Sequence, residues 1–191
     1  MNIDPSRTFE EFEKFGLTGA RELFHQNNIK TVLDDFETGV YCAVEFRNKF
    51  REITGLTITD EMFDYAWNAM LLDLPPERIK RVKELAKKYK TYLLSNTTPI
   101  HSRCFNKKLE QVTGLETFDQ LLDKAWYSYN LGLRKPDIRI FEMVLAKSRL
   151  NPSETLYIDD YEVNVKAAEQ AGMKGLVVNG EYTILEGLKD Y

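Results

Sequence analysis

The stretch LYIDDYEVN (residues 156–164) decides the fold, because a short apolar run in it stops at two adjacent carboxylates and a helix follows at once. Residues 155–158 are β-branched, aliphatic or aromatic and follow a turn-prone segment, which predicts a short buried strand. Valine and alanine then recur at helical spacing up to Gly172. We therefore expect Asp159 and Asp160 at the carboxyl end of a strand, where open α/β sheets bind their ligands.

The two adjacent carboxylates have two interpretations. In the first, Asp160 only caps the following helix and Asp159 is the polar end of the strand. One carboxylate suffices for that role, whereas two adjacent carboxylates repel each other unless a cation or another partner lies near. The second interpretation is therefore a cation site, and the pair alone leaves both open.

Helices and strands alternate through most of the chain around this stretch. Predicted helices at 76–89, 99–112 and 136–147 each lead to a predicted strand, at 91–94, 125–129 and 155–158, and a last helix leads to a strand at 175–178. This alternation is typical of βαβ units and predicts a doubly wound parallel sheet with helices on both faces. The first 75 residues show only helical periodicity. The sequence thus predicts an α/β core preceded by a helical module.

Composition excludes several classes of protein. Hydrophobic residues make up 43% of the 191 residues, which indicates a globular chain, and the net charge of −4 argues against nucleic-acid and membrane-surface binding. The basic run at 80–90 has apolar residues at helical spacing, so we interpret it as the solvated face of a helix. Cys42 and Cys104 have no metal-binding spacing, which favours a reduced cytoplasmic protein. No apolar run approaches the roughly 18 residues of a membrane helix.

Polar residues follow three of the predicted strands. Ser95 and Asn96 come after the first, at the start of a helix, where small donors bind anions. Lys135 stands before Pro136, and the acidic pair follows the third strand. Each feature has an ordinary explanation, as a capped turn or a solvated charge. Because parallel strands share one rim, the three together predict a Mg²⁺-dependent phosphoryl-transfer site.

Three segments resemble a known family. LLSNTT (93–98), LGLRKPDIRIFE (131–142) and TLYIDDYEVNVKAAEQAGM (155–173) resemble the second, third and fourth motifs of the haloacid dehalogenase superfamily, in the same order. The helical part before them, including FETG (36–39), resembles the inserted cap of its sugar-phosphate phosphatase-like branch. The resemblance implies a Rossmann-like core at 75–191 and a helical cap at 11–74.

The resemblance also implies roles for the rim residues. Ser95 and Asn96 would hold the transferring phosphoryl group, and Lys135 would neutralise its charge. Asp159 and Asp160 would together hold Mg²⁺, with Asp159 as the direct ligand and Asp160 ordering a water molecule or Lys135. The implied substrate is a small phosphorylated metabolite, and a homodimer is left open.

The first motif of the family, which carries the nucleophilic Asp, is not visible in the sequence. Asp4 has only three residues before it, too few for a buried central strand, so residues 1–10 are interpreted as a remnant after that strand. Asp35 has similar neighbours, but its position matches the helical module. We expect a start upstream of Met1 rather than a true loss of the nucleophile, and we expect the chain as given to be inactive.

Four functions are compatible with these residues. A phosphatase of small metabolites is the favoured one, and a catalytically inactive phosphate-binding or scaffolding relative is the alternative. A receiver-type signalling domain uses similar residues but places its acidic pair first, whereas Asp159 and Asp160 come last here. A dehalogenase is the fourth, and the acidic pair with Lys135 is better suited to Mg²⁺ and phosphate.

Overall fold

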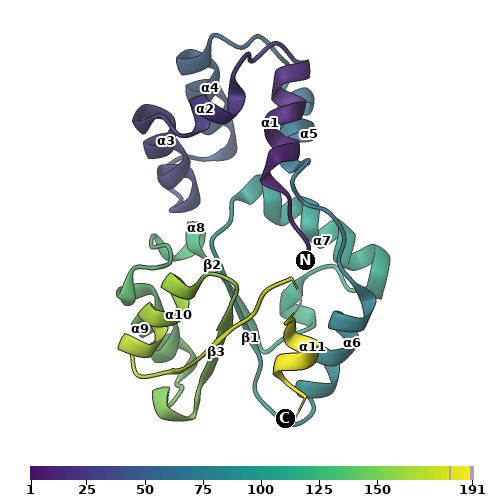
Figure 1. Cartoon of the computed structure of the whole chain (residues 1–191), viewed down its shortest axis with the longest axis vertical. Coiled ribbons are helices and arrows are strands. Elements are labelled where there is room, and N and C mark those ends of the chain that lie inside the picture. Colours follow the sequence, from purple (N-terminus) through teal and green to yellow (C-terminus); the bar gives the residue numbers. More distant parts are fainter. Residues whose placement is uncertain (181, 190–191) are drawn as a thin grey trace.

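The computed structural model describes residues 1–180 and 182–189, and its N-terminal part is helical apart from an isolated antiparallel bridge between Ile3 and Leu71. The helices of this part are α1 (Pro5–Lys14), α2 (Ala20–Phe24), α3 (Asn27–Glu37), α4 (Ala43–Thr54) and α5 (Asp60–Asn68). This helical module forms one end of the molecule, and the α/β region forms the other (Figure 1). The helical periodicity of the first third of the chain is confirmed.

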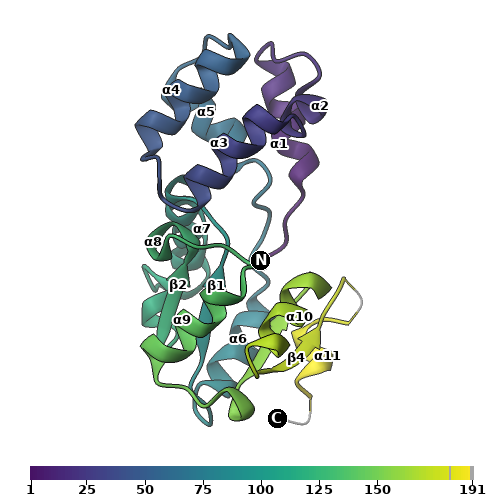
Figure 2. The ribbon, with the colours of Figure 1, turned by 90° about the vertical axis from the view of Figure 1, so that its left-hand side faces the viewer.

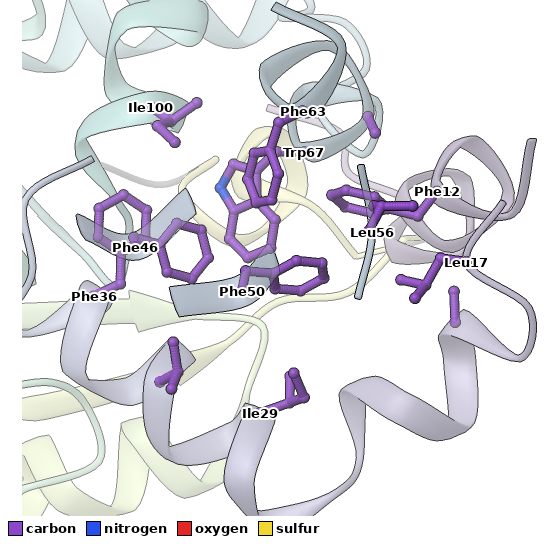
Figure 3. Packing of buried hydrophobic residues seen from close by; sticks show 13 residues of the cluster. Phe12, Leu17, Ile29, Phe36, Phe46, Phe50, Leu56, Phe63, Trp67 and Ile100 are labelled. Atoms are coloured by element: carbon purple, nitrogen blue, oxygen red, sulfur yellow. The ribbon is translucent and has the colours of Figure 1, made fainter. Parts of the chain in front are cut away.

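A cluster of aromatic rings holds the helical module together (Figure 3). The Phe36 and Phe46 rings stack with centroids 4.0 Å apart, and Phe46 meets the Trp67 ring edge-on at 5.0 Å. Each fully buried phenylalanine contributes about 1.5–3 kcal/mol to stability. Ile100, in the first turn of helix 99–113 of the α/β region, belongs to the same cluster. The module is therefore packed against the α/β region rather than tethered to it.

The boundary predicted after residue 10 falls inside a helix. Asp4 caps α1, its carboxylate accepting a hydrogen bond from the Ser6 N–H, and Pro5 occupies the first helical position. Phe12, later in the same helix, is fully buried in the aromatic cluster. Residues 5–10 are thus part of the helical module, because Phe9 and Phe12 of the same helix both pack in the aromatic cluster.

The α/β region repeats the predicted alternation of helices and strands. In chain order its elements are α6 (Pro76–Leu85), β1 (Tyr92–Ser95), α7 (Pro99–Thr113), η1 (Phe118–Gln120), β2 (Lys124–Tyr127), α8 (Ser128–Leu131), α9 (Ile138–Ser148), η2 (Pro152–Glu154), β3 (Leu156–Asp159), α10 (Glu162–Gln170), β4 (Lys174–Val177) and α11 (Ile184–Gly187). The strands lie between α8–α10 on one side and α6, α7 and α11 on the other (Figures 1 and 2). Each strand lies within two residues of its predicted range.

The four strands form two separate parallel pairs instead of the single sheet that the alternation predicts. β1 pairs with β2, with Ser95 opposite Tyr127, and β3 pairs with β4, with Asp159 opposite Val177. Residues inside a parallel sheet are normally buried on both faces. Every residue of β1 is only partly buried, and so are the first three of β3. Within residues 1–180 and 182–189, no strand joins the two pairs.

One hydrophobic cluster nevertheless lies beneath both strand pairs. It is built on Phe141 of α9 and Ala168 of α10, and both Leu94 of β1 and Tyr157 of β3 pack against it. The two pairs therefore share one hydrophobic cluster, although no backbone hydrogen bond among the described residues links them. In the described part of the chain, no helix is long and apolar enough to cross a membrane.

A buried polar cluster around Trp67 joins the helical module to α7. The indole N–H donates to the Thr98 hydroxyl at 3.3 Å, and the Trp67 carbonyl lies 2.9 Å from Nε2 of His101. The two rings stack at 5.2 Å. Burial lowers the pKa of His101 from 6.5 to about 4, more than the hydrogen bond to Trp67 and the Asp64 charge raise it.

His101 should therefore make stability depend on pH. The unfolded chain binds a proton at His101 below about pH 6.5, whereas the folded chain binds one only near pH 4. The stability that neutral His101 contributes is therefore fully present above pH 6.5 and is lost as pH falls. We expect the difference in unfolding free energy between wild type and His101→Gln to shrink by about 2 kcal/mol from pH 7.5 to pH 5.0. Urea unfolding at both pH values measures it. An unchanged difference would contradict a buried neutral histidine.

Candidate active site

A lysine ammonium lies between the carboxyl ends of the two strand pairs. Nζ of Lys135, from the loop between α8 and α9, donates to Oδ2 of Asp159 at 2.7 Å and to the Leu94 carbonyl at 3.2 Å. Lys135 and Asp159 are 24 residues apart, and their side chains are only 10% and 6% exposed. The structure thus brings together the ends of β1 and β3 and the predicted lysine, as the shared rim of parallel strands requires.

The Asp159 carboxylate is fully hydrogen-bonded. Its Oδ2 accepts from Lys135 Nζ and from the Tyr157 hydroxyl at 2.5 Å, and its Oδ1 accepts from the Tyr161 N–H at 2.9 Å and from Nδ2 of Asn164 at 3.0 Å. Burial alone would raise the pKa of Asp159, but the Lys135 charge and these donors outweigh burial and hold the pKa below its usual value. Asp159 is thus an anchored anion in direct contact with the Lys135 ammonium.

Asp160 has a different environment from its neighbour. Its side chain is exposed, and among the described residues it has no hydrogen bond or ion pair. Of the two expectations for Asp160, ordering a water molecule or ordering Lys135, the second is not met among the described residues, because an extended backbone turns consecutive side chains to opposite faces. Asp159 takes that contact, and Asp160 keeps its carboxylate oxygens free.

The Asn96 side chain acts on Lys135 rather than standing free for a ligand. Oδ1 of Asn96 accepts from the Lys135 N–H at 2.8 Å, and Nδ2 donates to the Lys135 carbonyl at 2.9 Å. These two hydrogen bonds hold the Lys135 backbone next to the end of β1. By contrast, the Ser95 hydroxyl has only a long 3.4 Å contact with the Asn96 carbonyl. Ser95 is therefore the side chain of this pair that can receive a ligand.

Comparison with known proteins identifies the arrangement. Residues 3–172 match the family model of haloacid dehalogenase-like hydrolases. The chain belongs to this family. The membership inferred from the three sequence motifs is confirmed.

The curated relatives of this haloacid dehalogenase-like hydrolase include phosphatases. A D-ribitol-5-phosphate phosphatase of Bacteroides thetaiotaomicron is 28% identical over 176 residues, covering 91% of this chain and 84% of that protein. A sesquiterpene phosphatase of Aspergillus oryzae is 26% identical over 171 residues, covering 90% of this chain and 72% of that protein.

Solved structures of similar proteins have the same fold. A haloacid dehalogenase family enzyme of Bacteroides thetaiotaomicron, solved with magnesium and inorganic phosphate, is 31% identical with a TM-score of 0.86, covering 93% of this chain and 88% of that one. A Porphyromonas gingivalis protein with a TM-score of 0.88 is 24% identical, covers 99% of this chain and 90% of that one, and shows the fold alone.

Two residues of this hydrolase's site were missed at the sequence level. The buried Ser128 hydroxyl accepts from the Thr97 N–H at 3.0 Å and donates to the Thr97 carbonyl at 3.2 Å, which fixes the loop after β1. Tyr157 lies two residues before Asp159 on the same strand face, so strand periodicity could have identified it as a neighbour of the carboxylate. Ser128 gave no such signal, since the predicted strand at 125–129 included it, whereas in the structure β2 ends at Tyr127.

Removal of the Asn96 amide should destabilise the protein measurably. Asn96→Ala deletes both hydrogen bonds to the Lys135 backbone, so we expect the free energy of unfolding to fall by about 1–2 kcal/mol. Asn130→Ala is the matched control, since Asn130 is exposed on α8 and should change stability by less than about 0.5 kcal/mol. Urea unfolding compares the two, and equal effects would contradict the role given to Asn96.

Proposed function

We propose that this haloacid dehalogenase-like hydrolase is a Mg²⁺-dependent phosphatase of small phosphorylated metabolites. The observation that carries the proposal is the Lys135 ammonium, held by Asp159 and the Leu94 carbonyl at the rim where β1 and β3 end. A phosphate monoester carries up to about two negative charges near neutral pH. A cation fixed in a partly buried site stabilises such charge without having to reorganise. The phosphatase activities named for the two curated relatives support the same reaction class.

The chain's own residues have separate tasks in this proposal. The Ser95 hydroxyl donates to a phosphoryl oxygen, and Lys135 neutralises the phosphoryl charge. Asn96 and Asp159 touch no substrate and instead hold the backbone and the ammonium of Lys135. The resemblance implied that Ser95 and Asn96 together hold the phosphoryl group, whereas this proposal gives the Asn96 side chain to the Lys135 backbone.

The residues at the rim fit a magnesium ion. Mg²⁺ in phosphoryl-transfer sites is bound by one or two carboxylates together with substrate phosphate. Asp160 offers free carboxylate oxygens, whereas all the hydrogen bonds of Asp159 are directed to protein groups. We therefore assign the direct contact to Asp160 and the supporting role to Asp159, the reverse of the order expected from sequence. When bound, Mg²⁺ would neutralise phosphoryl charge and orient the reacting group. The similar Bacteroides enzyme was solved with both magnesium and phosphate.

The attacking group in this proposal is an Asp on an additional parallel strand between β1 and β3, which would form an aspartyl-phosphate. Three features support this: the two pairs are both parallel, β1 and the start of β3 are only partly buried, and Lys135 lies between them. Asp35 does not meet the requirement, because it lies inside α3 rather than at the end of a strand.

The 191-residue chain should have no measurable turnover, and a form extended at its amino end by a strand ending in Asp should have Mg²⁺-dependent turnover. Removal of a nucleophile costs several orders of magnitude because the remaining groups only assist. Release of phosphate from p-nitrophenyl phosphate and from pentitol and sugar phosphates, with and without Mg²⁺, measures both forms. Robust turnover by the 191-residue chain would refute the proposal that the nucleophilic Asp lies on an additional strand.

In the active form, Lys135→Met and Asp160→Asn should each lower kcat/KM by about 100-fold or more. Asp35→Asn should leave it unchanged, since Asp35 lies within the helical module. Asp160→Asn should in addition raise the Mg²⁺ concentration needed for half-maximal rate. Loss of activity with Asp35→Asn would move the nucleophile to α3 and overturn the assignment.

A non-catalytic phosphate-binding protein is the second candidate. It is favoured by one observation, that no carboxylate of the described residues lies on a strand between β1 and β3. If the extended form binds inorganic phosphate by calorimetry but hydrolyses none of the esters, this candidate replaces the phosphatase.

A further inference from the structure

The C-terminal end of α3 contacts the segment that carries Lys135. Arg134, the residue directly before Lys135, forms an ion pair with Asp34 of α3, and its Nε lies 2.9 Å from Oε2 of Glu37. In both views this end of α3 lies next to α8 (Figures 1 and 2). The helical module thus reaches the rim through one arginine and two carboxylates.

The backbone at the end of α3 is also in close contact with α8. Gly39 has φ +78°, and a Cβ at this position would lie 2.2 Å from the Tyr129 carbonyl oxygen. Any other residue would have to displace backbone, so only glycine permits this approach. The contact fixes where Asp34 and Glu37 stand relative to Arg134.

The charges at this contact are mutually dependent. Burial raises the pKa of Glu37, Asp34 raises it further, and the Arg134 and Lys135 charges lower it. The approach of Glu37 Oε2 to Arg134 Nε lacks hydrogen-bond geometry, although both atoms are almost covered. The attraction between Glu37 and Arg134 is therefore largely Coulombic, and it can weaken without the loss of a hydrogen bond between these two residues.

We propose that Arg134 is a positioning residue that couples the docking of α3 to the orientation of the Lys135 side chain. Asn96 holds the Lys135 backbone from β1, while Asp34 and Glu37 hold the preceding residue from the helical module. With α3 docked, Lys135 is fixed from both sides. With α3 displaced, Arg134 loses both partners, and the lysine is retained by Asn96, Asp159 and the Leu94 carbonyl. The inference depends on the proposed function in one respect, which is that the proposed function makes phosphate the ligand of Lys135.

The position of α3 can be measured as the distance between two spin labels by double electron–electron resonance. Spin labels at Lys30→Cys on α3 and Lys147→Cys on α9, both exposed, report the separation in a Cys42→Ser, Cys104→Ser background. We expect one narrow distance distribution for this background. Arg134→Met and the pair Asp34→Asn with Glu37→Gln should each broaden it. Asp35→Asn removes the same charge from the adjacent residue of α3 and should leave it narrow.

The orientation of Lys135 is measured separately by its reactivity. Dilute acetic anhydride acetylates lysines, and peptide mass spectrometry gives the acetylation rate of Lys135 relative to that of Lys147. We expect Arg134→Met to raise the relative rate at Lys135 by about 5-fold or more. Asp34→Asn with Glu37→Gln should give the same increase, and combining all three should add nothing, since they act through one contact. Asp35→Asn should leave the rate unchanged.

These outcomes separate a positioning role from a purely structural ion pair. A broadened distance with unchanged Lys135 reactivity would show an ion pair that merely holds α3, and it would overturn the proposal. Unchanged distance and reactivity would overturn it as well. Should Arg134→Met fail to fold, the carboxylate variants test the same contact from the other side. Neither measurement depends on turnover, so both remain interpretable if the phosphatase assignment fails.

Discussion

The ion pair between Lys135 and Asp159 is the interaction on which the site depends. A charged lysine with so little exposure requires a compensating anion, because burying an unpaired charge costs several kcal/mol. Asp159 supplies it and is itself held by Tyr157, Tyr161 and Asn164. The pair spans elements that share no backbone hydrogen bond, and it therefore sets the geometry at the rim between the two strand pairs.

The division of the strands into two pairs gives this ion pair its importance. In a continuous parallel sheet, ladder hydrogen bonds would fix the spacing of β1 and β3. Here the common hydrophobic cluster under α9 and α10 and the Lys135 side chain carry that function. The same division accounts for the half-buried apolar residues of β1. It is also the structural basis for proposing an additional strand that carries the nucleophile.

Much of the fold followed from local patterns in the chain. Apolar periodicity located the helices and strands, since burial of one face governs both, and the order of polar residues after the strands placed Lys135 and Asp159 at one rim. The individual contacts were not predictable. Asn96 was expected to bind phosphate, but its amide is paired with the Lys135 backbone, 39 residues away in sequence. Which of the two adjacent carboxylates meets Lys135 was likewise decided by the direction of each side chain.

The sequence by itself determined the family, the parallel α/β architecture and the residue types at the rim, because these depend on periodicity and on spacing along the chain. Only the tertiary structure decided which of the two adjacent carboxylates contacts Lys135 and which amide is hydrogen-bonded to the Lys135 backbone. It also decided that Asp34 of α3 forms an ion pair with Arg134. Such choices depend on the orientations of side chains from segments distant in sequence. A linear pattern fixes the element on which a residue lies, whereas packing between elements fixes the group that the residue meets.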